Sequence, residues 1–412
     1  MARWRRLTVS QTAGVACIAL AMGGVLAIAA SGRTDDPPVP ARGEPLPRRE
    51  DLPAQRRYAW DVVAKLDLID GTRRALSAKW LRAEDMFTSA ALARAANGKT
   101  DAHGTMAQSG EPQIIIFTLY DAAGAGHIRA HKLHERAQLE HLLATGLADP
   151  RIPENRTIPP FPAETTVLLT AWWPIASEGT TAMPVWDPEL NPTRSGGNNY
   201  ATWHRAVAVS RSNAAGTEEV VTSGRHFPTA RRVSLDAFHS IVVDDEIAAR
   251  NRQNDHAHKA AVIALGRELR AGDALALVAV HVAVKVSEQW AWATLWWHDA
   301  ADRGAFAQDR PAALPGAWRN YLLDVAFDAE LPRAADGGPH AAFNPWLEAR
   351  FPDAGAGGGV VSNCVACHGR ASYPAVSFLP VTRGAPNLSD DPAYAPGRLR
   401  TDFLWSLPRQ AR

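Results

Sequence analysis

The spacing of hydrophobic residues in the first third of the chain is typical of helices. The stretch "RRYAWDVVAKLDLIDGTRRALSAKWLRAEDMFTSAAL", which begins at Arg56, is mostly helical in pattern. A second stretch, "DAAGAGHIRAHKLHERAQLEHLLATGL", keeps the helical spacing of its apolar residues, which include Ile128, Leu133 and Leu139. The pattern therefore predicts that helices precede the rest of the fold.

The pattern then changes to that of strands. Runs of alternating β-branched and aromatic residues occupy residues 165–175, 201–210, 232–243, 274–286 and 290–298. The last two, "ALALVAVHVAVKV" and "WAWATLWWHD", are separated by three residues and predict a long hairpin. We therefore expect the α+β class, with a β-rich antiparallel sheet or sandwich, N-terminal helices on one side of it, and a small helical module at the C-terminus.

The N-terminus carries the pattern of an export signal. Three arginines at the start precede an apolar stretch from about Ala13 to Ala30, which ends in small residues. Because this stretch is close to the ~20 residues that span a bilayer, an uncleaved anchor in the inner membrane is the alternative. Residues 1–31 are thus predicted as a signal peptide or anchor, and residues 32–55, with six prolines, as a linker.

The overall composition limits the classes of function. The chain has 412 residues and a formal net charge of +1, which gives no reason to expect a nucleic acid as partner. With 46% hydrophobic residues it is long enough for a large domain, predicted at 56–340, and a second, smaller one. The export signal predicts a periplasmic protein.

One pair of cysteines, in "SNCVACHGR", lies outside the export signal. A structural zinc site needs four ligands, and no second cysteine pair is present. A thioredoxin-type dithiol belongs to a βαβ context that this sequence lacks, and a disulfide across three residues would constrain little. The run from Cys364 through Cys367 to His368 matches C-x-x-C-H, the attachment sequence of c-type haem. It predicts one covalent haem c, with thioethers at both cysteines and His368 as an axial iron ligand.

The end of the chain resembles a compact c-type cytochrome module from residue 343 onward, and we place this haem module at 341–412. The resemblance implies a short helix at "FNPWLEARF" and an aromatic terminal helix at "LRTDFLWSLP". It also implies that Pro380, twelve residues after the motif histidine, orients that histidine through its backbone carbonyl. A downstream methionine usually fills the second iron position in this family, but all five methionines here precede the motif.

The second iron ligand would then come from the large domain. His298 is the first candidate because it ends the Trp-rich strand, and neutral imidazole is a good iron ligand. His127 and Met183 are the next candidates. Each has an ordinary alternative: His298 as a hydrogen-bonded histidine at a sheet edge, and His127 as part of a solvent-facing helical stripe.

The chain also resembles large exported bacterial proteins that end in a single haem c motif. The resemblance runs from "FTLYDAAGAGHIR" through "LLTAWWPI" to "WATLWWHD". This resemblance supports the architecture alone. The haem motif, without a recognisable catalytic constellation, favours a periplasmic monohaem cytochrome that exchanges electrons with a redox partner protein. One alternative is a haem enzyme, or a sensor of gas or peroxide, with an open sixth iron position. Another is a binding module for carbohydrate or polypeptide, in which the Trp-rich strands form the site and the haem is accessory.

Overall fold

The computed structural model describes residues 46–73, 75–87, 114–146, 156–188, 190, 200–212, 215–348, 363–375 and 397–412. The predicted signal peptide or anchor, the first part of the predicted linker and Pro380 lie outside these ranges. Contacts divide the chain into Met1–Arg42 and Gly43–Arg412, and every described residue belongs to the second unit. Across the described ranges, no helix combines the length and the apolar character needed to span a membrane.

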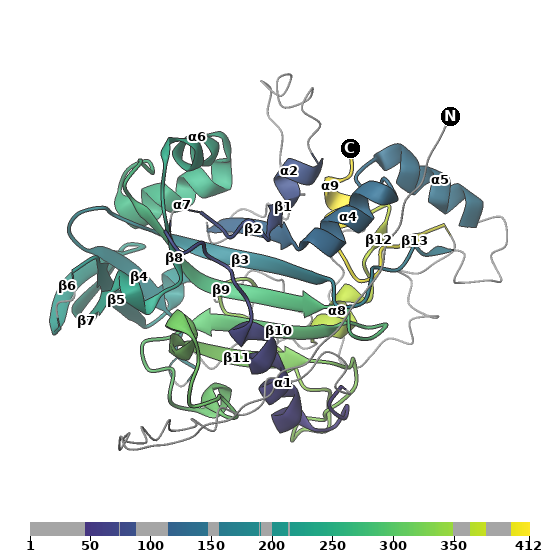
Figure 1. Cartoon of the computed structure of the whole chain (residues 1–412). Coiled ribbons are helices and arrows are strands. Elements are labelled where there is room, and N and C mark those ends of the chain that lie inside the picture. The colour runs from purple at the N-terminus through teal and green to yellow at the C-terminus, as the bar shows by residue number, and fades with distance from the viewer. Residues whose placement is uncertain are drawn as a thin grey trace, which may run out of the picture. The chain divides into compact units, whose positions relative to one another are not determined.

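A sheet of seven strands forms the centre of this unit (Figure 1). Its order is β1-β2-β3-β9-β10-β11, with β8 beside β9, and all of these neighbours are antiparallel. The predicted α+β class is confirmed, and the predicted hairpin is formed by β9 and β10. The bounds are β1 Leu81–Arg82, β2 Ile115–Tyr120, β3 Thr166–Ile175, β8 Ser240–Val242, β9 Ala274–Val284, β10 Ala291–Trp297 and β11 Tyr321–Ala326.

A second sheet of four strands has the order β4-β5-β7-β6 and includes one parallel pair, β5 with β7, among its described strands. The range 232–243, predicted as one strand, is divided between the two sheets. β7 ends at Ser234, whose hydroxyl accepts a hydrogen bond from the Asp236 N–H (3.2 Å) and begins a 3₁₀ turn that breaks the strand before β8. The bounds are β4 Thr181–Val185, β5 Arg205–Ser210, β6 Thr217–Thr222 and β7 Arg225–Ser234.

Helices pack around the larger sheet. α1 contacts β11, α7 contacts β2, β3 and β4, and α4 contacts β2 and β3. α6 and α7 were not predicted, because their sequence lies between strand-like runs and α6 is mostly polar. The bounds are α1 Leu52–Ala64, α2 Ala83–Phe87, α4 Ala122–Ala130, α5 Arg136–Gly146, α6 Asp245–Gln253 and α7 Asp255–Leu265.

Local capping explains where two of these helices begin. α1 starts at Leu52, inside the range predicted as linker, because the Asp51 carboxylate accepts a hydrogen bond from the Ala54 N–H (2.9 Å). Proline at the second helical position is also compatible with a helix start, since its missing N–H is not needed there. In α4 the Asp121 carboxylate accepts from the Gly124 N–H and from the Thr166 N–H of β3, both at 2.7 Å. That residue therefore joins the helix to the sheet.

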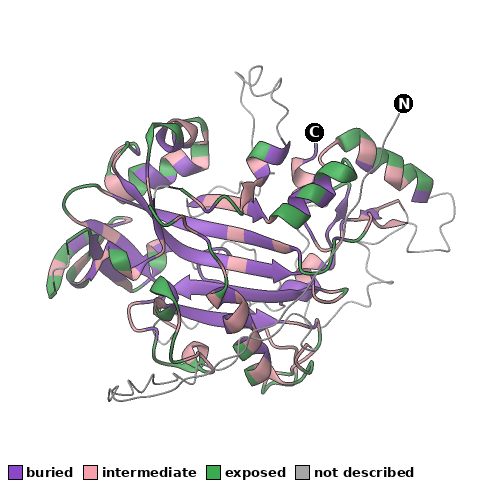
Figure 2. Cartoon of the chain, viewed as in Figure 1, coloured by how far each residue is buried: buried purple, intermediate pink, exposed green. Residues whose placement is uncertain are grey.

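The interior contains two hydrophobic clusters. The main cluster surrounds β3, β9, β10 and β11, and Figure 2 shows these strands buried over most of their length while the helices keep exposed faces. The second cluster joins α4, α5 and the start of β10 to the C-terminal segment, with Trp290, Trp292, Cys364, Leu399 and Leu407 among its buried members. The C-terminal segment is therefore built into the same compact unit as the sheet.

The described C-terminal residues differ from the predicted helical module. They contain α8 Cys364–His368, the strand pair β12 Ser372–Tyr373 with β13 Leu399–Arg400, and α9 Ser406–Gln410. Of the predicted helix at 343–351, the described part, residues 343–348, contains a turn at 345–348. The predicted terminal helix is interrupted by Asp402 and Phe403, whose φ angles of 45° and 68° are incompatible with a right-handed helix.

A partly buried histidine directly before β8 should make the fold sensitive to acid. His239 packs on Trp318, with 4.2 Å between ring centroids, and its buried Nε2 has no hydrogen-bond partner among the described residues. Burial, together with Arg73, lowers the pKa of His239 from 6.5 to about 4. As the pH falls from 6.5 towards 4, the unfolded chain takes up a proton that the folded chain excludes, so stability is lost in this window.

We expect His239→Phe to remove this loss, because a phenyl ring stacks on Trp318 without a titrating nitrogen. Between pH 7 and pH 4.5 the variant should lose about 2 kcal/mol less free energy of unfolding than the wild type. Urea unfolding at the two pH values measures the difference. Identical pH dependence in the two proteins would contradict the role given to His239.

Candidate functional site

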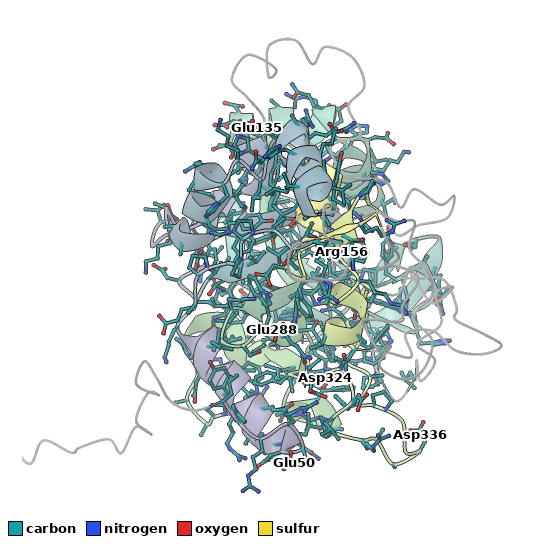
Figure 3. The ribbon with its side chains drawn as sticks, turned by 90° about the vertical axis from the view of Figure 1, so that its right-hand side faces the viewer. Glu50, Glu135, Arg156, Glu288, Asp324 and Asp336 are labelled. Carbon is teal, nitrogen blue, oxygen red and sulfur yellow. The ribbon has the colours of Figure 1, made fainter. Side chains whose placement is uncertain are left out.

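The predicted motif residues form a single helical turn at one end of the large sheet. In Figure 1, α8 lies at the end where β9 stops and β10 begins. Figure 3 faces this end, with Glu288 of the β9–β10 turn and Asp324 of β11 labelled. The position of Cys364 and Cys367, one turn apart, places both thiols on the same side of the helix.

Asn363 fixes the start of this helical turn and joins it to the rest of the unit. Its side-chain oxygen accepts from the Ala366 N–H at 3.1 Å, which caps the helix. Its amide NH₂ donates to the carbonyls of Asp328 (2.9 Å), Ala329 (3.4 Å) and His340 (3.3 Å). Asn363 was not predicted as a site residue from the sequence, although asparagine before a short helical run is a capping signal.

Neither cysteine forms a disulfide; Cys364 is buried and Cys367 is partly buried. Burial, with a smaller contribution from Glu348, raises the pKa of Cys367 to about 12 and raises that of Cys364 well above its usual value. Both groups are therefore neutral thiols at pH 7, unlike the low-pKa thiolates of dithiol oxidoreductases. This chemistry disfavours a thioredoxin-type role and leaves two intact sulfhydryls for covalent attachment.

His368 is held in one orientation by two contacts. Its Nδ1 donates a hydrogen bond to the carbonyl of Phe403 at 2.8 Å, and its ring lies 4.1 Å from the Trp292 ring of β10, centroid to centroid. Burial lowers the pKa of His368 to about 4, so the ring is neutral at pH 7. Since Nδ1 carries the proton, Nε2 carries the free electron pair. A neutral imidazole oriented in this way is the form that ligates iron.

The carbonyl that orients His368 is therefore that of Phe403. The resemblance assigned this role to Pro380, which lies outside the described residues. Phe403 comes 35 positions after His368 and was interpreted as a residue of a terminal helix. No spacing rule in the sequence indicated it, because the contact depends on the left-handed turn at residues 402 and 403.

The structure does not bring His298 to His368. His298 follows the last residue of β10, whereas Trp292, which contacts His368, is near the first, and six strand residues span about 20 Å. The Nδ1 of His298 accepts from the Ala300 N–H at 2.9 Å, and its Nε2 lies 3.5 Å from Arg205 Nη1. Arg205 in turn binds both oxygens of Asp299, at 2.8 and 2.6 Å. His298 is thus a hydrogen-bonded histidine at the sheet edge, the alternative that the sequence had left open.

The other two candidates for the second iron ligand make other contacts. Nε2 of His127 hydrogen-bonds the carbonyl of Pro159 at 3.0 Å, and the ring contacts His131 and Phe161. Met183 is buried in β4 within the main cluster. Within the described ranges, no three His, Cys, Asp or Glu side chains are grouped so as to hold a bare metal ion.

The donor set at this site fits a covalent haem. It provides two neutral thiols one helical turn apart, and a neutral imidazole whose other nitrogen is fixed by a carbonyl. Arg370 and Arg409 are close enough to Cys367 to lower the pKa of its thiol, so the site also has cationic groups nearby. Comparison with models of known families, with curated proteins and with solved structures gave no match.

Proposed function

We propose that this protein is a periplasmic monohaem c-type cytochrome that transfers electrons to or from a redox partner protein. Cys364 and Cys367 would hold the haem through thioethers, and His368 would ligate the iron. The group would supply one-electron chemistry when bound. The observation that carries the proposal is the orientation of His368 by the Phe403 carbonyl, beside two free thiols on the same helical turn.

Two tryptophans would exclude water from the side of the site on which His368 lies. Trp292 covers one face of the His368 ring, and Trp290 lies next to it, with 6.3 Å between the two ring centroids. Both indoles are buried. A dry surrounding favours outer-sphere electron exchange, because little solvent reorganises when the charge on the site changes. The location in the periplasm rests on the export signal of residues 1–31.

Haem attachment tests the proposal directly. Expression with the haem-maturation machinery should give a band that stains for haem after denaturing electrophoresis. We expect Cys364→Ser and Cys367→Ser each to weaken this band, and the double substitution to abolish it. His368→Gln should change the visible spectrum of the reduced protein, because the iron loses its protein ligand.

Cys17→Ser is the matched control, because this cysteine lies inside the predicted export signal and should not contribute to attachment. A haem band that persists in the double Cys364→Ser/Cys367→Ser variant would overturn the assignment. Fractionation adds a second check, since the stained protein should be found in the periplasm or on the inner membrane.

A second function, a haem enzyme or a sensor of gas or peroxide, is favoured by the positions of His298 and Met183. Both are held in other parts of the fold, and residues 376–396 contain neither histidine nor methionine. An iron with an exchangeable sixth position would bind carbon monoxide in its reduced form. A shift of the visible spectrum with carbon monoxide supports this function, and an unchanged spectrum supports electron transfer alone.

A further inference from the structure

The turn that orients His368 has an unfavourable backbone conformation. Asp402 and Phe403 both have positive φ angles, 45° and 68°, although neither is glycine. Each such residue costs about 1 kcal/mol relative to the right-handed region. Two in succession persist only where the surrounding contacts hold them in place. The carbonyl of Phe403, which accepts the hydrogen bond from His368, belongs to this turn.

The Asp402 side chain is bound by two separate segments of the fold, the β9–β10 turn and the loop before β3. One carboxylate oxygen accepts from Lys285 Nζ at 2.6 Å and from the Trp290 indole N–H at 3.4 Å. The other accepts from the Phe161 N–H at 2.9 Å. The side chains of Lys285 and Asp402 are each only 10% exposed. A buried ion pair with these additional hydrogen bonds is strongly specified in geometry.

We propose that Asp402 is the positioning residue for His368. By binding the Lys285 ammonium, the Trp290 indole and the Phe161 amide, it holds the left-handed turn and keeps the Phe403 carbonyl at Nδ1. The hydrogen bond then fixes the proton on Nδ1 and leaves the electron pair on Nε2, the nitrogen that would ligate the iron. Contact with Trp292 fixes the plane of the His368 ring, and the hydrogen bond to the turn fixes the direction in which Nδ1 points within that plane. The inference rests on the proposed role of His368 as an iron ligand.

The ring tautomer in the haem-free chain is the direct test. In water, free imidazole side chains prefer the proton on Nε2, so an Nδ1–H form of His368 reports the Phe403 hydrogen bond. We expect ¹⁵N NMR of the full chain at pH 7, produced without haem, to show His368 as Nδ1–H, assigned with His368→Gln. In Asp402→Ala the Nε2–H form should become the major one. Alanine removes the side-chain anchor and keeps the unfavourable positive φ, so the contacts that hold the turn are lost while its cost remains.

A second variant avoids an unpaired buried charge. Lys285→Met/Asp402→Asn removes both charges, which is better tolerated than removing one. It should also shift the tautomer towards Nε2–H. The matched control is Lys259→Met/Asp255→Asn, which removes an exposed ion pair of the same length, 2.6 Å. This control should leave His368 as Nδ1–H.

A single Nδ1–H form in folded Asp402→Ala, or in the folded double variant, would overturn the proposal. If one of the two variants does not fold, the other decides. The readout does not depend on haem. A failure of haem staining would therefore refute the proposed function without changing this result. In haem-loaded protein the same variants should have a higher midpoint potential, because His368 becomes a weaker donor to iron.

Discussion

Trp292→Ala should produce one of the largest losses of stability in this protein, about 4 kcal/mol in the free energy of unfolding. The indole is buried at 4% exposure, packs on His368 and Trp290, and donates from Nε1 to the carbonyl of Gln289 at 2.9 Å. Its removal leaves a cavity between β10 and α8 that the flanking sheet cannot close. Urea unfolding of the haem-free chain measures the loss.

Trp80→Ala is the matched control, because Trp80 is only partly buried and donates to the backbone carbonyl of Asp67 in the same way. Trp80→Ala should lower the free energy of unfolding by about 1.5 kcal/mol. Trp292→Phe should recover more than half of the loss by restoring a ring beside His368. Equal losses in Trp292→Ala and Trp80→Ala would show that the cluster beneath α8 is loosely packed.

Asn363→Ala should lower the free energy of unfolding by about 3 kcal/mol, through two separate contributions. Loss of the helix cap accounts for about 1 kcal/mol. The rest comes from buried carbonyls, those of Asp328, Ala329 and His340, which lose their hydrogen-bond donor. Because Asn363 ties α8 to the segment after β11, we also expect the variant to attach less haem in the electrophoretic assay.

Asp244→Ala separates the two contributions. Asp244 is an exposed cap that accepts from the Ile247 N–H at 2.7 Å, so its loss should cost only about 1 kcal/mol. Asn363→Ser, which keeps an acceptor for the cap but loses the amide donors, should fall between the two. Denaturant midpoints of the three variants give the order. If Asn363→Ala lowers the free energy of unfolding no more than Asp244→Ala does, Asn363 does not tie α8 to the segment after β11.

The long periodic segments were predictable from the sequence because their local pattern and their burial agree. β9 and β10 are apolar except for His281 and Thr294, and such long apolar runs favour paired strands at the centre of a sheet. The helical stretch that contains Ile128 and Leu139 formed in part, as α4 and α5, but a turn at residues 131–134 with Lys132 at a φ of 54° separates the two helices. Shorter elements such as β4, β6 and β11 were missed, because strands of five or six residues gain most of their stability from neighbours that the sequence does not specify.

The sequence by itself determined the chemistry of the candidate site, since Cys364, Cys367 and His368 are adjacent and need no fold to bring them together. The tertiary structure decided what surrounds them. It selected the Phe403 carbonyl as the partner of His368, placed Trp292 against its ring, and kept His298 at the far end of β10. The physical reason is that covalent spacing fixes contacts only within a helical turn. Partners 35 or more residues apart depend on strand register and on a turn held by a buried ion pair, and both are products of the whole fold.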